Sequence, residues 1–259
     1  MGIGEKRKIL GLTFHVGDVH SAVEQMLQGG LLVVPAAPAL KDLASNTAYC
    51  EALQSADVVI TDSAFMVLVW NLLERDSIQR VSGLEYLTEI LKHEAMQQPG
   101  STLWVMAGPK STRANLKWLA SQNISVPASH IYEAPIYGAE ICDEVLLEKI
   151  RVLRPQHVVV TLGGGVQERL GLYLKRNLDY LPSIHCIGAA IAFCSGDQVR
   201  IPMWADRLYL GWLFRCVSSP FRYVPRYWAA RKLFPLLLRH RSESPATAAG
   251  MARNRRGPG

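Results

Sequence analysis

The stretch that decides the fold reads HVVVTLGGGVQE, residues 157–168. Its first six residues are mostly apolar and β-branched, which is typical of a strand buried on both faces of a parallel sheet. The three glycines Gly163, Gly164 and Gly165 then lead into a segment with helical spacing. The stretch therefore predicts a buried strand, a tight turn and a helix.

The same alternation of buried strand and amphipathic helix continues outward in both directions. We predict further strands at residues 31–34, 56–60, 102–106, 131–132 and 183–187, and further helices at residues 40–55, 64–73, 83–95, 111–120 and 140–153. Strands that alternate with helices predict an α/β fold with a parallel, doubly wound, Rossmann-like sheet. Ligands of such a sheet bind at the carboxyl ends of its strands.

Composition divides the chain into four segments. A turn-rich QQPGS at residues 97–101 separates a smaller N-terminal α/β unit, residues 1–98, from a Rossmann-like unit, residues 99–198. A basic, aromatic appendage, residues 199–241, follows, and residues 242–259 have the composition of a disordered basic tail. The hydrophobic content of 49% over 259 residues is enough for a full-sized core, which excludes a largely disordered chain.

Positive charge is concentrated in the last quarter of the chain. The net charge is only +6, yet residues 199–259 hold 12 Lys or Arg and only two acids, Asp206 and Glu243. Nine of the 21 aromatic residues lie in the same quarter. Aromatic rings beside cations suit a membrane interface, and also nucleic acid. We expect an anionic membrane surface or a lipid-linked substrate as the partner, with nucleic acid as the alternative.

Cysteine usage and hydropathy indicate the cellular compartment in which the protein is found. The five cysteines are scattered and never spaced as C-x-x-C, so they support neither a disulfide framework nor a zinc site. No apolar run approaches the roughly 18 residues of a spanning helix, and the first residues lack the apolar core of a signal peptide. These features predict a cytoplasmic protein that is peripheral on the inner face of the membrane.

Polar residues and glycines follow the predicted strands. Asp62 ends a buried strand and precedes an apolar helix, where its carboxylate could be a general base or only the helix N-cap. Arg80 and Glu85 flank Gly83 at a helix start, either as substrate ligands or as a solvated ion pair. The glycine turn at residues 163–165 could place bare N–H groups against a diphosphate, or be a tight turn alone.

Three arginines stand out in the C-terminal appendage. Arg215, Arg222 and Arg226 lie among large aromatic residues, and arginine suits bidentate recognition of phosphate. Their spacing places them on roughly one helical face only if a helix continues through Pro220 and Pro225. We interpret them as phosphate ligands rather than as a solvated basic face.

These segments together resemble the WecG/TagA/CpsF family of bacterial glycosyltransferases over residues 31–228. The most specific match is LGWLFR at residues 210–215 with SPFRY at residues 219–223 and Arg226-Tyr227, similar to the family's G-L-E-W-L-F-R, E-P-R-R and R-Y ending. Residues 56–63 are similar to its A-D-L-V-x-x-D-G element, residues 80–87 to R-x-x-G-x-D-L, and residues 158–168 to a strand with a G-x-P-K-Q-E turn. Residues 188–196 lie where the family has G-G-A-F-D-F and a glycine.

The resemblance implies an enzyme of bacterial exopolysaccharide or cell-envelope synthesis. It would transfer a sugar, often of N-acetylmannosamine type, from a UDP-sugar to a polyprenyl-diphosphate-linked acceptor, with inversion and without metal or other cofactor. Asp62 would be the general base, and Arg215, Arg222 and Arg226 would bind the lipid diphosphate. The nucleotide-sugar would meet Arg80, Gly83, Gly108, Gly163, Gly164, Gly165, Gln167 and Glu168. A homo-oligomer is also implied, and a nucleic-acid partner is not.

Four positions depart from the family pattern. Ala37 stands at an asparagine position, Val166 at a lysine, Ala192 at an aspartate and Ser63 at a glycine. They favour a different donor sugar, or the alternative of a weak or inactive relative that binds a nucleotide-sugar or lipid intermediate and scaffolds polysaccharide assembly. Within the appendage, we expect the later run, residues 228–241, to hold the membrane through its leucines and Phe234.

Overall fold

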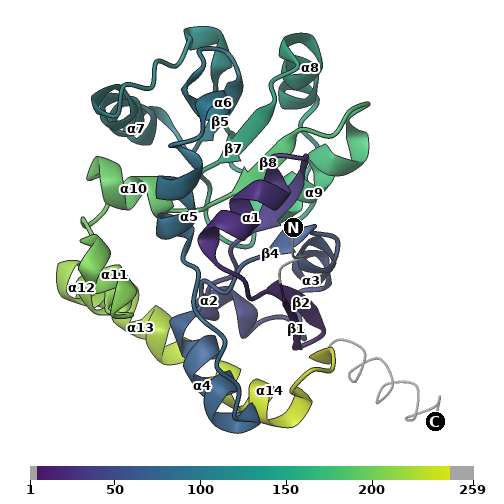
Figure 1. Ribbon diagram of the computed structural model, residues 1–259, viewed down its shortest axis with the longest axis vertical. Helices are drawn as coiled ribbons and strands as arrows, with labels where there is room; N and C mark the ends of the chain where they lie inside the picture. Colours follow the sequence, from purple (N-terminus) through teal and green to yellow (C-terminus); the bar gives the residue numbers. More distant parts are fainter. Residues whose placement is uncertain (1–4, 246–259) are drawn as a thin grey trace.

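The computed structural model describes residues 5–245 and is built around a six-stranded parallel sheet of order β4-β3-β8-β7-β5-β6 (Figure 1). Its strands are β3 (Gly30–Val33), β4 (Val58–Val59), β5 (Thr102–Met106), β6 (Ile131–Glu133), β7 (His157–Val160) and β8 (Ser183–Cys186). β8 pairs with both β3 and β7, so the sheet is continuous between strands that precede and follow residue 98. The predicted parallel, doubly wound α/β fold is confirmed.

Two hydrophobic cores lie on the two faces of the sheet. Successive strand residues point to opposite faces, so Val158 and Val160 of β7 join one core and Val159 joins the other. The first core packs against helices α3 (Thr47–Gln54), α4 (Ala64–Glu74), α8 (Glu144–Leu153) and α9 (Gln167–Asn177). The second packs against α1 (Val19–Met26), α5 (Gly83–Ile90), α6 (Glu94–Gln97) and α7 (Pro109–Ser121).

Three predicted helices have different bounds in the structure. The helix expected at residues 40–55 is two helices, α2 (Ala37–Leu40) and α3, because Asn46 caps α3 by accepting from Tyr49 N at 3.0 Å. The helix expected at residues 83–95 likewise ends at Ile90, before α6. The helix expected at residues 140–153 starts only at Glu144, where Asp143 is its N-cap.

A β-hairpin near the start of the chain was not predicted. Strands β1 (Lys6–Ile9) and β2 (Leu12–His15) pair antiparallel around a turn in which Leu10 and Gly11 both have positive φ. Ile9, Leu12 and Phe14 are fully buried in the first core. A bridge from His15 to Ile60 joins the hairpin to the loop after β4.

The C-terminal arm, residues 199–241, is helical, as predicted. After α10 (Ala190–Ser195) it forms α11 (Met203–Arg207), α12 (Gly211–Ser218), α13 (Pro220–Ala230) and α14 (Leu233–His240). α13 packs against α2, and α14 lies beside α4 at the lower end of the molecule in Figure 1. Because α2 directly follows β3, the arm crosses the carboxyl edge of the sheet.

The chain leaves the arm along the hairpin. Leu10 N donates to Arg241 O at 2.7 Å, and Gly11 N donates to Ser242 O at 3.1 Å. Most of the predicted disordered tail, residues 246–259, lies outside the described residues. Within residues 5–245, no helix is both long enough and apolar enough to cross a bilayer.

Candidate active site

The topological switch point of the sheet lies between β5 and β7. The chain runs from β5 to β6 on one side and from β7 to β8 on the other, so the loops after these neighbouring strands diverge. Gly108 lies in the loop after β5, and Gly163 to Gly165 form the loop after β7. Doubly wound proteins bind ligands at this place.

The glycine turn after β7 is open. Gly163 and Gly164 are exposed, and a Cβ built on Gly163 or Gly165 would meet no atom within 4 Å. Gly165 has a φ of +91°, in the left-handed region that favours glycine. Helix α9 begins two residues later, so its positive dipole end lies at the turn, where the N–H groups of Val166 and Gln167 donate to Gly163 O at 3.2 Å each. The turn can therefore receive an anionic group.

Gln167 and Glu168 support this turn from beneath. Both side chains are buried, at 1% exposure each. Glu168 Oε2 accepts from Gly165 N at 2.6 Å, and Gln167 Oε1 accepts from Gly188 N at 2.6 Å, beyond the end of β8. Burial raises the pKa of the Glu168 carboxyl above its ordinary value. Both side chains therefore make hydrogen bonds within the protein: Glu168 holds the turn itself, and Gln167 joins the start of α9 to the loop after β8.

Asp62 follows β4 at the same edge of the sheet. Its Oδ1 accepts from Gly83 N, in the first turn of α5, at 3.0 Å. Ser63 caps α4 by accepting from Met66 N at 3.2 Å, so the alternative of Asp62 as that helix's cap is wrong. The Asp62 side chain is 22% exposed, and its Oδ2 has no hydrogen-bond partner among residues 5–245. One carboxylate oxygen is therefore open to a ligand.

Arg80 is largely buried beside Asp62. Its Nε donates to Asp62 O at 2.7 Å, its Nη1 to Asp206 O at 2.8 Å and its Nη2 to Asp206 Oδ1 at 3.0 Å. Nη2 also lies 3.6 Å from Asp62 Oδ1. Burial alone would lower the pKa of the guanidinium, but the carboxylates of Asp62 and Asp206 raise it above its ordinary value. The alternative ion pair with Glu85 is wrong, because Arg80 pairs with these two aspartates.

The loop that carries Arg80 is held by the residue before Asp62. Thr61 Oγ1 donates to Gln79 O at 2.8 Å and accepts from Val81 N at 3.0 Å. Both peptide groups that flank Arg80 are therefore tied to the end of β4. This local arrangement fixes Arg80 next to Asp62 although the two are 18 residues apart in sequence.

A series of contacts joins Asp62 to the glycine turn along the carboxyl edge. Asp62 binds Gly83 N, and a Cβ on Gly83 would lie 3.5 Å from Ile187 O, which follows β8. The next residue, Gly188, donates to Gln167 beneath the turn. The structure therefore brings the predicted residues of α5, α9 and the β4 loop to one edge.

The three predicted arginine ligands occupy two environments. Arg215, on α12, stacks over the Phe193 ring at 4.2 Å and donates from Nη1 to Tyr227 Oη at 3.1 Å. Its buried Nε has no hydrogen-bond partner within residues 5–245. Arg222 and Arg226 are exposed on α13. A break at Ser219 separates the two helices, so the arginines do not share one helical face.

Two buried polar residues near this edge were missed by the sequence reasoning. Asp206, on α11, is 5% exposed and binds Arg80; the only signal was its being one of two acids in a basic quarter. Tyr49, on α3, is 1% exposed, and its hydroxyl has no hydrogen-bond partner in the described chain. Burial raises the pKa of Tyr49, as does the nearby Glu168 carboxylate. No local pattern distinguishes Tyr49 from an ordinary core tyrosine.

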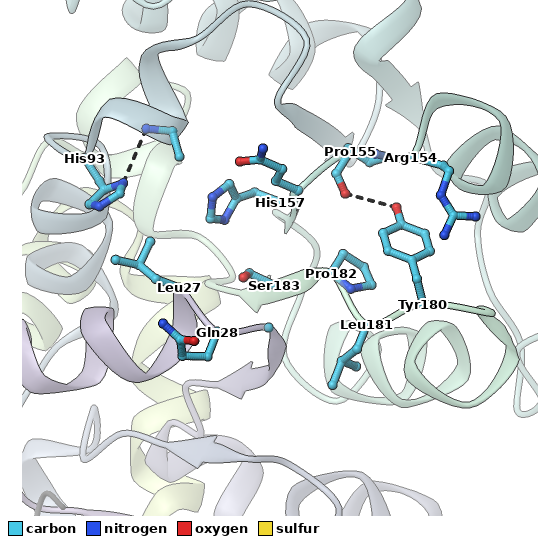
Figure 2. A pocket seen from close by; sticks show the side chains of 13 residues that line it. Leu27, Gln28, His93, Arg154, Pro155, His157, Tyr180, Leu181, Pro182 and Ser183 are labelled. Carbon is cyan, nitrogen blue, oxygen red and sulfur yellow. Dashed lines mark hydrogen bonds between the residues drawn. The ribbon is translucent and has the colours of Figure 1, made fainter.

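A pocket of about 460 Å³ lies at the opposite, amino edge of the sheet (Figure 2). His93, Arg154, His157 and Tyr180 are among the residues that line it. The Tyr180 hydroxyl donates to Pro155 O at 3.0 Å. None of the residues predicted to bind substrate lines this pocket.

The fold and the carboxyl edge define a Rossmann-like α/β protein with an open glycine turn at the switch point of its sheet. The chain belongs to the WecG/TagA/CpsF family of glycosyl transferases, whose sequence profile matches residues 7–246. The resemblance inferred from the motifs is thereby confirmed, and the chain is a glycosyltransferase.

Curated relatives cover most of the chain. It is 21% identical over 227 residues to the N-acetylglucosaminyldiphosphoundecaprenol N-acetyl-beta-D-mannosaminyltransferase of Staphylococcus aureus strain MW2, covering 83% of this chain and 85% of the relative. The enzyme of the same name from strain NCTC 8325 / PS 47 is 21% identical over 225 residues, covering 82% and 84%. The name of these relatives states a sugar transfer to a diphosphoundecaprenol-linked acceptor.

Proposed function

We propose that this chain transfers a sugar from a UDP-sugar to a polyprenyl-diphosphate-linked acceptor, with inversion at the anomeric carbon. The observation that carries the proposal is the open Oδ2 of Asp62 at the same sheet edge as the open glycine turn at residues 163–165. The relatives' printed activity supports the acceptor class and an N-acetylmannosamine type of donor.

Asp62 suits the role of general base. The acceptor hydroxyl attacks the anomeric carbon as its proton passes to Asp62 Oδ2, and the bond from that carbon to the UDP oxygen breaks with its electron pair. The bond from Asp62 Oδ1 to Gly83 N holds the carboxylate in place during this transfer. A single displacement of this kind inverts the configuration of the sugar.

The glycine turn and the start of α9 suit the leaving diphosphate. Negative charge grows on UDP as the bond breaks, and N–H groups at a helix N-terminus stabilise it. Glycines at positions 163–165 leave room for the phosphates to approach the backbone closely. In this proposal the transfer needs no metal, and Gly108 supplies the opposite wall of the donor site.

The C-terminal arm suits a lipid-linked acceptor at an anionic membrane surface. The buried Arg215 Nε–H has no acceptor within the described residues, and a diphosphate oxygen would supply one. Arg222 and Arg226 are exposed beside Phe221 and Trp228, which are 97% and 68% exposed. Exposed aromatic rings with arginines are typical of a membrane interface. In this proposal the enzyme works on the inner face of the cell membrane and associates with further copies of itself.

The structure corrects the prediction that the leucines of residues 228–241 hold the membrane. Leu233 and Leu237 of α14 are fully buried in the first core, beside α4, so they cannot insert into lipid while folded. Phe234 and Leu238 remain 42% and 49% exposed. Deleting residues from 228 onward would therefore remove core packing as well as lipid contacts. Membrane binding is better tested by point substitutions on α12 and α13.

Transfer from a panel of UDP-sugars to polyprenyl-diphosphate acceptors tests the proposal. We expect turnover with at least one donor. Asp62→Asn should reduce it by roughly 10²- to 10⁴-fold, and the matched control Asp179→Asn, which removes an exposed aspartate near the amino edge, should leave it unchanged. UDP binding without turnover from any donor would instead support the scaffolding relative, for which the residues at positions 37, 166 and 192 argue. Binding to RNA or DNA but not to anionic liposomes at physiological salt would contradict the membrane partner.

A further inference from the structure

Asp206 links the C-terminal arm to the candidate active site. It lies on α11 and is 5% exposed, in a segment otherwise rich in Lys and Arg. Its Oδ1 accepts from Arg80 Nη2 at 3.0 Å, and its Oδ2 accepts from Ser82 Oγ. Its backbone oxygen accepts from Arg80 Nη1 at 2.8 Å. All three oxygens of this residue are thus directed at residues 80–82.

Residues 80–83 are the same segment that positions Asp62. Arg80 Nε holds the Asp62 backbone oxygen at 2.7 Å, and Gly83 N holds its Oδ1 at 3.0 Å. Ser82 is the N-cap of α5, accepting from Glu85 N at 3.0 Å while it donates to Asp206. A second contact from the arm places the Tyr209 ring 5.7 Å from the Arg80 guanidinium. The seating of α11 is therefore directly connected to the placement of Asp62.

Arg80 is shared between two carboxylates, and the sharing is uneven. Nη2 lies 3.0 Å from Asp206 Oδ1 but 3.6 Å from Asp62 Oδ1. Asp206 therefore draws the guanidinium away from Asp62 and leaves the Asp62 carboxylate a single short bond, to Gly83. If Asp206 lost its charge, the buried guanidinium would keep one carboxylate neighbour and would turn towards it. Asp62 would then be held in an ion pair in place of receiving a proton.

We propose that Asp206 is a positioning residue that couples the seating of the C-terminal arm to the reactive geometry of Asp62. Asp206 does not contact substrate; it acts by keeping Arg80 and Ser82 in place. The kinetic part of this inference rests on the proposed function, whereas the structural coupling does not.

Gly211 offers a route to restore the charge from another position. A Cβ on Gly211 would lie 3.7 Å from Asp206 Oδ1, at ordinary contact distance, and Gly211 does not have a positive φ. The same Cβ would lie 3.5 Å from Ile201 Cδ1, also an ordinary contact, so an aspartate at this position would place a negative charge next to the side chain of residue 206 and near Arg80. Rescue of Asp206→Asn by Gly211→Asp would separate the loss of charge from general damage to the fold.

The test combines steady-state kinetics with hydrogen exchange on the full chain. For Asp206→Asn we expect kcat to fall by about 30-fold with little change in KM for the UDP-sugar, because positioning is lost while donor binding remains. Amides of residues 79–83 should exchange about tenfold faster, with those of residues 157–160 unchanged. Asp206→Asn combined with Gly211→Asp should recover much of kcat, and liposome binding should stay at the wild-type level in both variants.

Each outcome decides one part of the inference. Unchanged exchange at residues 79–83 in Asp206→Asn overturns the coupling, whether or not the enzyme turns over. If exchange rises but the wild type transfers no sugar, the proposed function fails and the coupling stands. A kcat within threefold of wild type, or a parallel loss of kcat and donor binding without rescue, overturns the positioning role. If Asp206→Asn does not fold, Ser82→Ala removes one bond to Asp206 without changing any charge, and exchange at residues 79–83 is measured in the same way. Ser63→Ala, which also removes a helix N-cap, is its matched control.

Discussion

The two edges of the central sheet carry different chemistry. The carboxyl edge holds Asp62, the open glycine turn and the arm; among residues 5–245, Asp62 Oδ2 has no hydrogen-bond partner, and a Cβ on Gly163 or Gly165 would meet no atom within 4 Å. The amino edge holds the pocket of Figure 2, whose polar groups largely satisfy one another: Arg154 pairs with Asp179 at 2.9 Å and stacks over Tyr180 at 4.4 Å. The candidate site is therefore indicated by the unpartnered Asp62 carboxylate oxygen after β4 and the open glycine turn after β7, and not by the volume of a pocket.

Behind the pocket, the amino edge continues into a buried polar series. His157 Nδ1 lies 3.1 Å from His185 Nε2, and His185 Nδ1 lies 2.8 Å from the Tyr86 hydroxyl. These groups satisfy one another inside the core and touch none of the predicted substrate ligands. We therefore expect changes at the carboxyl edge to affect activity, and changes at the amino edge to affect stability.

The largest effect is expected for Asp62→Asn. The amide keeps the size of the side chain and an oxygen for Gly83 N, but it cannot take a proton, so kcat should fall by roughly 10²- to 10⁴-fold. The thermal midpoint should change little. Initial rates with a saturating donor, together with a melting curve, check both. A kcat like that of wild type would show that Asp62 is not the base.

The amino edge should show the next largest effect, as a pH dependence of stability. Burial lowers the pKa of His157 from 6.5 to about 4. The folded state therefore resists protonation, so stability is complete above pH 6.5 and is lost as the pH falls toward about 4. The loss is on the order of 3 kcal/mol. Urea unfolding between pH 4 and 8 measures it.

His157→Gln should reduce this pH dependence without reducing turnover at pH 7.5; the remainder comes from His185, whose pKa burial also lowers. His20→Gln, an exposed substitution on α1, should leave the wild-type slope in place. A strong loss of turnover in His157→Gln would break the separation between the two edges.

A smaller effect is expected at the glycine turn. Gly165 has a φ of +91°, so Gly165→Ala strains the backbone by about 1–2 kcal/mol and distorts the predicted diphosphate site. UDP should bind about tenfold more weakly by calorimetry. Gly138→Ala is the matched control, since Gly138 is also free of neighbours within 4 Å but has no positive φ. Equal UDP affinity in both variants would move the donor away from this turn.

The smallest effect is expected on the arm. Each exposed arginine near an anionic bilayer contributes about 1 kcal/mol, so Arg222→Ala should weaken liposome binding about fivefold. Arg113→Ala, an exposed arginine on α7, is the control and should bind like wild type. Flotation with vesicles containing anionic lipid measures both. An equal loss in the two variants would mean that the arm is not the docking surface.

The sequence predicted what local patterns determine. The strands from β3 to β8 are short, mostly apolar runs, of which β4 and β7 are rich in valine. Helices α4 and α7 begin at clear start signals, the N-cap Ser63 and Pro109. The hairpin escaped because its strands are four residues each, and the first reads KRKI, with three basic residues of which one is half-buried and two are exposed. The order of the strands in the sheet could not be predicted from the sequence, because it depends on pairing between distant segments such as β3 and β8.

In the candidate site too, local patterns predicted some features, and contacts between distant residues determine the others. Asp62 and the glycine turn were predictable because each directly follows a strand. The bonds from Arg80 to Asp206 join residues 126 apart in sequence, and no local pattern records them. The arginines of the arm were predicted as phosphate ligands by residue type. The break at Ser219 that separates Arg215 from the other two follows from Pro220, because a proline disfavours helical backbone at the residue before it.

A crystal structure with UDP bound tests the central claim most directly. We expect diphosphate density at the glycine turn of residues 163–165, between the carboxyl ends of β5 and β7, with Asp62 facing the place of the sugar. Density for UDP in the amino-edge pocket, beside His157 and Tyr180, would contradict it.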